Sequence, residues 1–102
     1  MSATSWHLAG KSVDLQEGMH SVQAGRQKVV VARIGGKLYA FNGLCPHVAG
    51  PMHRGELNGL LLTCPLHGWR FDLAKAGCEI HGNRPLEMYE VKEELGQVYV
   101  SL

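Results

Sequence analysis

Two short segments of this chain carry side chains that bind metals. The first is Cys45-Pro46-His47 and the second is Cys64-Pro65-Leu66-His67, with sixteen residues between them. Each segment offers one thiolate and one imidazole, both common metal ligands. Pro46 and Pro65 indicate that both segments are loops, because proline cannot donate a hydrogen bond to a sheet. The spacing therefore predicts one metal centre that is held between two loops.

Two kinds of metal centre use two Cys and two His. In a Rieske [2Fe–2S] centre, two His replace two Cys on one iron, which removes negative charge and raises the reduction potential. Zinc binds the same four ligands as a tetrahedron, but structural zinc sites usually pair Cys with Cys and His with His. Here each loop supplies one of each, which favours one [2Fe–2S] cluster and leaves a zinc-binding interaction module as an alternative. The predicted ligands are Cys45, His47, Cys64 and His67.

The remaining His and Cys receive ordinary interpretations. The other histidines are His7, His20, His53 and His81. His53 follows the first segment closely, but its separation from Cys45 breaks the ligand spacing, so we place it at most on the rim of the loop. An odd number of cysteines fits a disulfide framework poorly, and Cys78 is expected to be a free thiol with a packing role.

Size and composition predict a single domain over residues 1–102, with 45% hydrophobic and 19% charged residues. The net charge is +1 with interspersed signs, which argues against nucleic acid as a partner and against strong electrostatic steering. No apolar run reaches the ~20 residues of a transmembrane helix, and the first residues lack the features of a signal peptide. We therefore expect a soluble, cytoplasmic protein that contacts no membrane.

Short β-branched and aromatic runs between glycine-rich turns predict an all-β fold, a sandwich or a barrel. The expected strands are 27–34, 37–41, 60–63, 69–72, 86–91 and 97–102. Gly35-Gly36 is a two-residue hairpin loop, since glycine accepts the positive φ of such turns. Further turns are expected at 58–59, 75–77 and 94–96. The chain offers no paired carboxylates, nucleophile elbow or phosphate loop, so we do not expect an enzyme.

These residues resemble the Rieske family. Its pattern, Cys-x-His, a spacer of about fifteen to seventeen residues and Cys-x-x-His, matches both segments, and the run from His67 to Leu73 (HGWRFDL) is also similar. The resemblance implies that Cys45 and Cys64 bind the inner iron, and that His47 and His67 bind the outer iron through Nδ1.

The same resemblance implies an antiparallel β-sandwich base domain that carries a small cluster-binding subdomain, roughly Asn42 to Asp72. A third loop, Gly82 to Pro85, is the candidate cover of the cluster. An apolar patch around the loops is expected to dock redox partners. Its expected members are Val48, Pro51, Met52, Leu66 and Trp69.

This sequence differs from one branch of the Rieske family, which reduces the number of functions to consider. Rieske proteins of quinol-oxidising complexes carry a disulfide between the ligand loops, which Gly50 and Leu66 exclude here. They also place a Ser and a Tyr near the cluster, where Trp69 and Phe71 stand in this chain. Fewer hydroxyl donors to sulfur predict a potential in the lower part of the Rieske range, ~−150 to ~+300 mV.

With the quinol-oxidising branch excluded, the chain resembles the soluble Rieske ferredoxins of oxygenase systems. These are one-electron carriers that connect an NAD(P)H-dependent flavoprotein reductase, or an iron–sulfur reductase, with a terminal aromatic-ring-hydroxylating oxygenase. We expect a monomer that binds such partners briefly. The alternative is a Rieske-type small subunit of a larger oxidoreductase such as assimilatory nitrite reductase. The large subunit of a Rieske oxygenase is excluded by length, since 102 residues leave no room for its catalytic domain.

Overall fold

The computed structural model describes residues 5–44, 51–66, 68–75, 77–80 and 84–102. Antiparallel strands build this part of the chain, and its helices are short 3-10 turns, so the predicted all-β fold is confirmed. The molecule is flat, with extents of 38 × 33 × 21 Å. No helix in the described ranges is long and apolar enough to cross a membrane.

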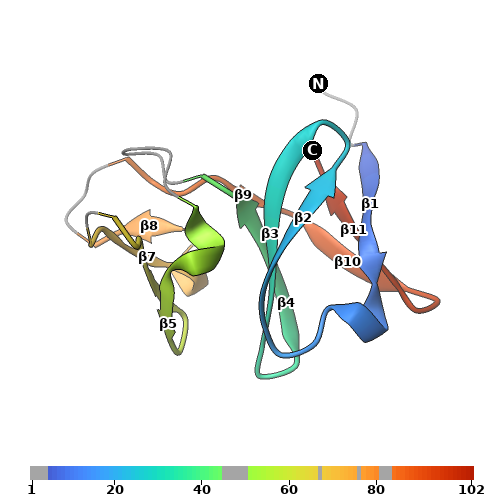
Figure 1. The fold of residues 1–102 in the computed structure, drawn as a ribbon, viewed down its shortest axis with the longest axis horizontal. Coiled ribbons are helices and arrows are strands. Elements are labelled where there is room, and N and C mark those ends of the chain that lie inside the picture. The colour runs from blue at the N-terminus through green and yellow to red at the C-terminus, as the bar shows by residue number, and fades with distance from the viewer. Residues whose placement is uncertain (1–4, 45–50, 67, 76, 81–83) are drawn as a thin grey trace.

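The elements, in chain order, are β1 (Trp6–Lys11), η1 (Ser12–Asp14), β2 (Gly18–Ala24), β3 (Gln27–Ile34), β4 (Lys37–Asn42), η2 (Met52–Arg54), β5 (Glu56–Asn58), β6 (Leu61–Thr63), β7 (Arg70–Asp72), η3 (Leu73–Lys75), β8 (Cys78–Glu79), β9 (Met88–Tyr89), β10 (Val91–Glu94) and β11 (Gln97–Ser101). They form three sheets, of order β1-β11-β10, β2-β3-β4-β9 and β5-β6-β7-β8. We call the first two sheets the base and the third the small sheet. Figure 1 shows the small sheet on the left and the base on the right.

Strand β3 separates two apolar cores. Successive side chains of a strand point to opposite faces, so an uninterrupted apolar run requires burial on both sides. Val29 and Val31 pack into the core of the base with Val98 and Val100. Val30 and Ala32 point the other way, into a second core that the base shares with the small sheet. The second core contains Val30, Ala32, Phe41, Met52, Leu62, Cys64, Phe71, Leu73 and Leu86.

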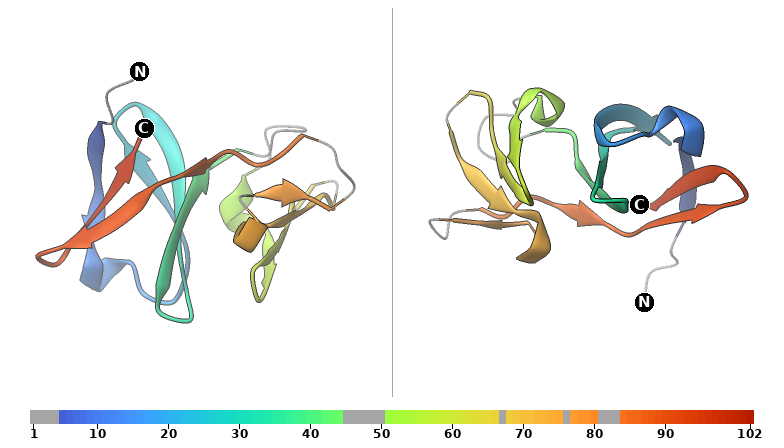
Figure 2. Two further views of the ribbon diagram at one scale, coloured as in Figure 1. Left: turned by 180° about the vertical axis from the view of Figure 1, so that it is seen from behind. Right: turned by 90° about the horizontal axis from the view of Figure 1, so that it is seen from below.

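The small sheet presents one row of side chains to this second core. Its register places Leu57 opposite Leu62, Leu62 opposite Phe71 and Phe71 opposite Glu79. Leu62, Phe71 and Glu79 are all buried, Glu79 with 2% of its surface exposed. Both views of Figure 2 show this sheet beside the base, so the shared core joins the two parts of the molecule.

The hairpin from Gln27 to Asn42 confirms the sequence prediction most closely. Strand β3 spans the predicted residues, and its turn places Gly35 and Gly36 at φ of 62° and 84°. Residues that carry a side chain rarely adopt such φ values, which explains why both turn positions are glycine. The chain also turns at Gly59 and at Gly96, as predicted. Predicted strand 86–91 is instead two strands, β9 and the start of β10, and β1, β2, β5 and β8 lie outside the predicted strands.

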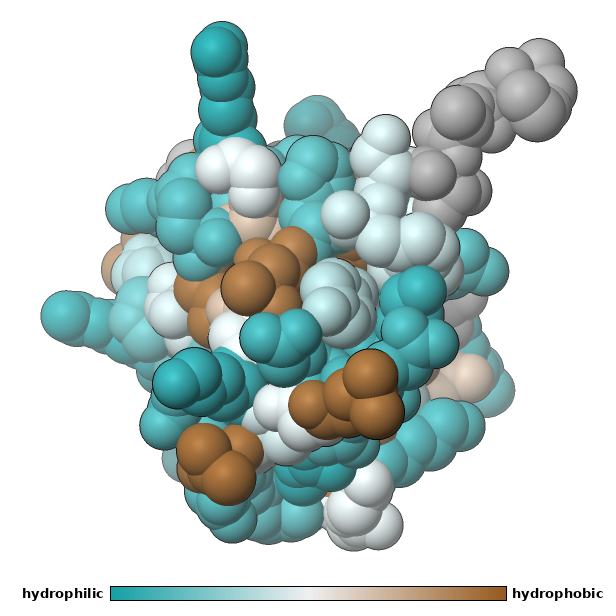
Figure 3. Space-filling model, turned by 90° about the vertical axis from the view of Figure 1, so that its right-hand side faces the viewer, coloured by the Kyte–Doolittle hydropathy of each residue, from teal (hydrophilic) through white to brown (hydrophobic). Residues whose placement is uncertain are grey.

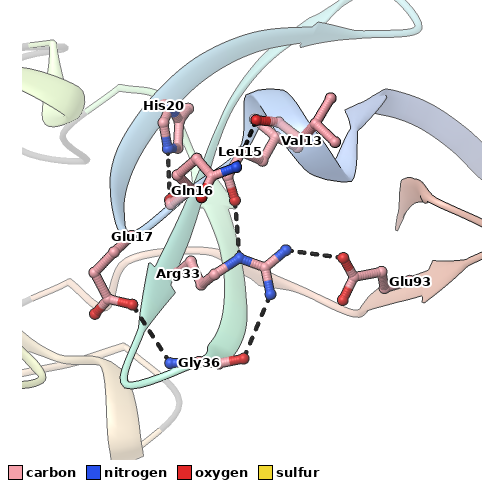
Figure 4. Close-up of polar contacts among 8 residues, drawn as sticks. All are labelled: Val13, Leu15, Gln16, Glu17, His20, Arg33, Gly36 and Glu93. Carbon is pink, nitrogen blue, oxygen red and sulfur yellow. Dashed lines mark hydrogen bonds and ion pairs between the residues drawn. The ribbon is translucent and has the colours of Figure 1, made fainter.

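One arginine joins three parts of the base (Figure 4). Arg33 of β3 donates from Nε to the carbonyl of Leu15 over 2.8 Å and from Nη2 to Glu93 of β10 over 2.9 Å. It also approaches the carbonyl of Gly36 at 3.5 Å. The guanidinium therefore connects the loop before β2, the β3–β4 turn and β10.

Replacing Arg33 with alanine should destabilise the base by about 1–2 kcal/mol, because the carbonyl of Leu15 loses its charged donor. Thermal unfolding of the variant measures this loss. The exposed Lys37 on the same hairpin provides the control, since Lys37→Ala removes a cation without a backbone hydrogen bond. Equal stabilities of the two variants would contradict the prediction.

The ion pair between Arg33 and Glu93 depends on pH. The hydrogen bond from Arg33 lowers the pKa of the Glu93 carboxyl below its ordinary value of 4.5. Since the folded-state pKa is the lower one, the stabilisation is present above the unfolded-state pKa and is lost as the pH falls through the folded-state pKa. An NMR titration of the Glu93 carboxyl in Arg33→Ala should show a pKa that has risen toward 4.5. An unchanged pKa would refute the assigned cause.

Candidate metal centre

The second predicted ligand segment leaves the small sheet directly after β6. The amide of Cys64 donates to the carbonyl of Trp69 over 2.7 Å, and the amide of Gly68 donates back to the carbonyl of Cys64 over 3.2 Å. Gly68 has a φ of 73°, which glycine adopts without strain. These bonds close a tight loop in which Cys64 is 2% exposed and Leu66 is 59% exposed. The thiol therefore faces the interior while the tip of the loop reaches solvent.

The first ligand segment, with Cys45 and His47, lies outside the described residues, but both ends of its loop are defined. Leu44 and Pro51 form an isolated antiparallel bridge. The amide of Met52 donates to the carbonyl of Gly43 over 3.0 Å, and the amide of Leu44 donates to the side chain of Asn42 over 2.9 Å. Residues 45–50 therefore begin and end at neighbouring points, between β4 and η2.

A close backbone approach joins the exit of the first loop to the strand before the second. At Gly55, which follows η2, a Cβ atom would lie 2.4 Å from the carbonyl oxygen of Thr63 and 3.1 Å from that of Met52. Only glycine fits this space, since a real Cβ atom does not come so near a backbone oxygen. Gly55 thus allows the exit of the first ligand-bearing loop to lie against the start of the second.

The third loop also begins and ends on the small sheet. The amide of Ile80 donates to the carbonyl of Arg70, and the amide of Leu86 donates to that of Gly77, each over 2.9 Å. A Cβ on Gly77 would lie 2.5 Å from the carbonyl oxygen of Leu86. Within the predicted cover segment, residues 82 and 83 lie outside the described part, and Arg84 and Pro85 are exposed.

The residues present fit an iron–sulfur cluster. Cys64 is a buried free thiol on a glycine-containing loop, in an apolar core with Met52 and Phe71, and a thiolate is the preferred ligand of cluster iron. Of the predicted ligands, Cys64 lies within the described residues, while Cys45, His47 and His67 lie outside them. The metal-binding roles of all four residues therefore stay predictions.

The structure also places the histidines, the cysteine and the methionine that the sequence analysis singled out besides the ligands. His53 is partly buried in η2, and His20 is bonded to the carbonyl of Gln16 over 2.8 Å in the base, far along the chain from the ligand loops. Cys78 belongs to β8, and its side chain lies outside the description. Met52 corrects an expectation: it is 0% exposed and packs in the second core, so it cannot belong to a docking patch.

Sequence reasoning missed the close backbone contacts of Gly55 and Gly77. A turn is predicted at 75–77, but no local pattern marks these two of the thirteen glycines as positions that admit no Cβ atom. Their importance comes from backbone oxygens of Thr63 and Leu86, which only the folded chain brings near.

The family follows from comparison with known proteins. The model of the Rieske [2Fe-2S] domain matches residues 5–90, which include both ligand segments. The chain therefore belongs to the Rieske [2Fe–2S] family, and its cofactor is one [2Fe–2S] cluster.

Among its relatives, ferredoxin CarAc of Metapseudomonas resinovorans is 31% identical over 103 residues, covering 94% of this chain and 92% of that protein. The oxygenase component of 3-ketosteroid-9-alpha-monooxygenase of Rhodococcus rhodochrous is 37% identical over 79 residues, covering 76% of this chain. The chain spans about a fifth (21%) of the length of that relative.

A solved structure agrees in fold. The complex of reduced oxygenase and oxidized ferredoxin in carbazole 1,9a-dioxygenase contains a chain with a TM-score of 0.82 and 29% identity, covering 94% of this chain and 92% of that one. The relatives that this chain covers nearly end to end are thus ferredoxin components of oxygenase systems.

Proposed function

We propose that this protein is a cytoplasmic one-electron carrier that passes electrons from an NAD(P)H-dependent flavoprotein or iron–sulfur reductase to a terminal oxygenase. The observation that carries the proposal is the nearly end-to-end match, 94% and 92% of the two lengths, with a ferredoxin of this class. The protein then transfers electrons and does not itself convert a substrate. A bound [2Fe–2S] cluster supplies reversible one-electron chemistry.

We further propose the ligand assignment that the sequence predicts. Cys45 and Cys64 hold the inner iron, and His47 and His67 hold the outer iron through Nδ1. The burial of Cys64 and the exposure of Leu66 in the same loop support this division, since they place the thiolate side inward and the tip of the loop toward solvent.

The proposed domain organisation is one Rieske domain over residues 1–102, with the cluster-binding subdomain at roughly 42–72. The separate small sheet supports it, since β5, β6 and β7 lie within that range. In the structure, β8 extends the same sheet to Glu79, which places the start of the third loop on the same support.

The proposed docking surface surrounds the ligand loops. Leu44, Leu66 and Ile80 are 45%, 59% and 46% exposed, and each lies in or directly before one of the three loops. On the opposite end of the base, Figure 3 shows apolar side chains as separate patches among hydrophilic ones. An apolar rim of limited size suits partners that must bind and leave quickly, and we propose that the free carrier is a monomer.

The reduction potential should fall in the lower part of the Rieske range, ~−150 to ~+300 mV. Phe71 is buried at the position where the quinol-oxidising branch has a hydroxyl, and Trp69 is the second such position. Without these donors the reduced state is less stabilised. A redox titration monitored by visible absorption measures the potential, and a value in the upper half of the range would refute the argument.

The function is tested on the purified protein by absorption and EPR spectroscopy before and after dithionite reduction. A red-brown protein whose reduced form has an average g value below that of all-Cys clusters supports the proposal. A colourless protein that contains zinc contradicts it. A large subunit that co-purifies in a stable complex favours the small-subunit alternative over a mobile carrier.

A further inference from the structure

A shallow groove runs along the outer face of the small sheet. It consists of two adjoining hollows of about 340 and 370 Å³, which share Glu56 and Thr63. One lies over β5–β7 and is also lined by Arg70; the other is also lined by Arg54, Cys64 and Pro65. We call this the arginine groove. It ends at the proposed cluster ligand Cys64, so an object bound in it lies beside the metal centre.

The charges that line the arginine groove have no partner within the described part of the chain. Arg54, Glu56 and Arg70 are exposed, and none of their side chains makes a hydrogen bond or ion pair with a described residue. The register places Glu56 opposite Thr63 and Thr63 opposite Arg70, so a full strand separates the carboxylate from that guanidinium. In the base, two cations do have such partners, since Arg33 pairs with Glu93 and Lys92 with Glu94.

The charge of the chain is also distributed unequally. Outside residues 51–86 there are six cations and six anions. Within that range, four cations face two solvent-accessible anions, since the third, Glu79, is buried. The members are Arg54, Arg70, Lys75 and Arg84, against Glu56 and Asp72. The net charge of +1 therefore does not describe the small sheet, around which exposed cations outnumber exposed anions.

We propose that the arginine groove binds an acidic surface of a redox protein, with carboxylates that pair with Arg54 and Arg70. This inference rests on the proposed function as an electron carrier. A planar guanidinium recognises a carboxylate with two parallel hydrogen bonds. Glu56 stands between the arginines and repels a compact polyanion, so the groove suits separate carboxylates on a protein. Exposed charge pairs speed association and add little affinity, as a brief encounter requires.

Binding to poly-L-glutamate tests the acidic partner directly and needs no electron transfer. Isothermal titration at low ionic strength should show affinity that is reduced ~10-fold in Arg54→Glu/Arg70→Glu. The control Lys11→Glu/Arg26→Glu makes the same change in net charge with exposed cations of the base, and its affinity should fall far less. Glu56→Gln should bind more tightly than the parent protein. Equal losses in the two double variants would overturn the proposal.

Electron transfer to small oxidants tests the field at the cluster. The reduced protein gives one electron to anionic hexacyanoferrate(III) or to cationic hexaammineruthenium(III), and each becomes its divalent-metal form. In stopped-flow measurements, Arg54→Glu/Arg70→Glu should slow the reaction with hexacyanoferrate(III) and speed the reaction with hexaammineruthenium(III). The base control Lys11→Glu/Arg26→Glu should change both rates little. An unchanged ratio of the two rates would overturn the inference. A protein without a cluster would refute the proposed function alone, because poly-L-glutamate binding still tests the groove.

Discussion

Replacing Cys64 with alanine should abolish the visible absorption and the reduced EPR signal of the purified protein. Cys64 is a buried thiol at the start of its loop, and an alanine there removes one of the two thiolates that we propose as ligands of the inner iron. Because a bound metal centre also stabilises a small fold, the variant should unfold at a lower temperature. Iron and sulfide analysis together with the two spectra measures the loss.

Two controls make this result specific. Cys78→Ala removes the other cysteine of the small sheet and should keep a full complement of iron. Among the histidines, His47→Ala and His67→Ala should lose the normal cluster, whereas His53→Ala should retain it. A cluster that survives in Cys64→Ala, or one that is lost in His53→Ala, would mean that the ligand assignment is wrong.

Replacing Gly55 with alanine should destabilise the protein by about 2–3 kcal/mol, since the added methyl group overlaps the backbone of β6 and cannot be relieved by a side-chain rotation. The new Cβ would lie 2.4 Å from the carbonyl oxygen of Thr63. In a domain of this size such a loss lowers the melting temperature by roughly 10–20 °C. The displacement would also move β6 relative to η2, so we expect less iron per chain.

The matched control for Gly55→Ala is Gly10→Ala in β1. There the nearest atom to a new Cβ is the Leu15 side chain at 3.5 Å, an ordinary van der Waals contact. This variant should melt within a few degrees of the parent protein and keep its iron. If both variants melt together, the close approach at Gly55 does not constrain the fold.

Local features of the chain predicted local structure well. The Val29–Val31 run and the Gly35-Gly36 turn determine the central hairpin, because strand preference and the positive φ of a tight turn depend on neighbouring residues. The sequence pattern did not predict β1 and β2, whose apolar positions are interrupted by His7, Gly10 and His20. These strands form because partners from β11 and β3 complete their hydrogen bonds.

By itself the sequence also determined the class of centre, because the spacing of Cys and His within each short segment is a local property, and the Rieske family match confirms that class. Only the tertiary structure determined which residues near the metal centre are buried, closely packed or exposed. Met52 follows the first loop and is apolar, but whether it faces solvent or the core depends on β6 and β7 packing over it. The need for glycine at position 55 arises from Thr63, eight residues away at the end of β6. The excess of cations around the small sheet rises from one to two because Glu79 turns inward, and a count of charges cannot tell a buried carboxylate from an exposed one.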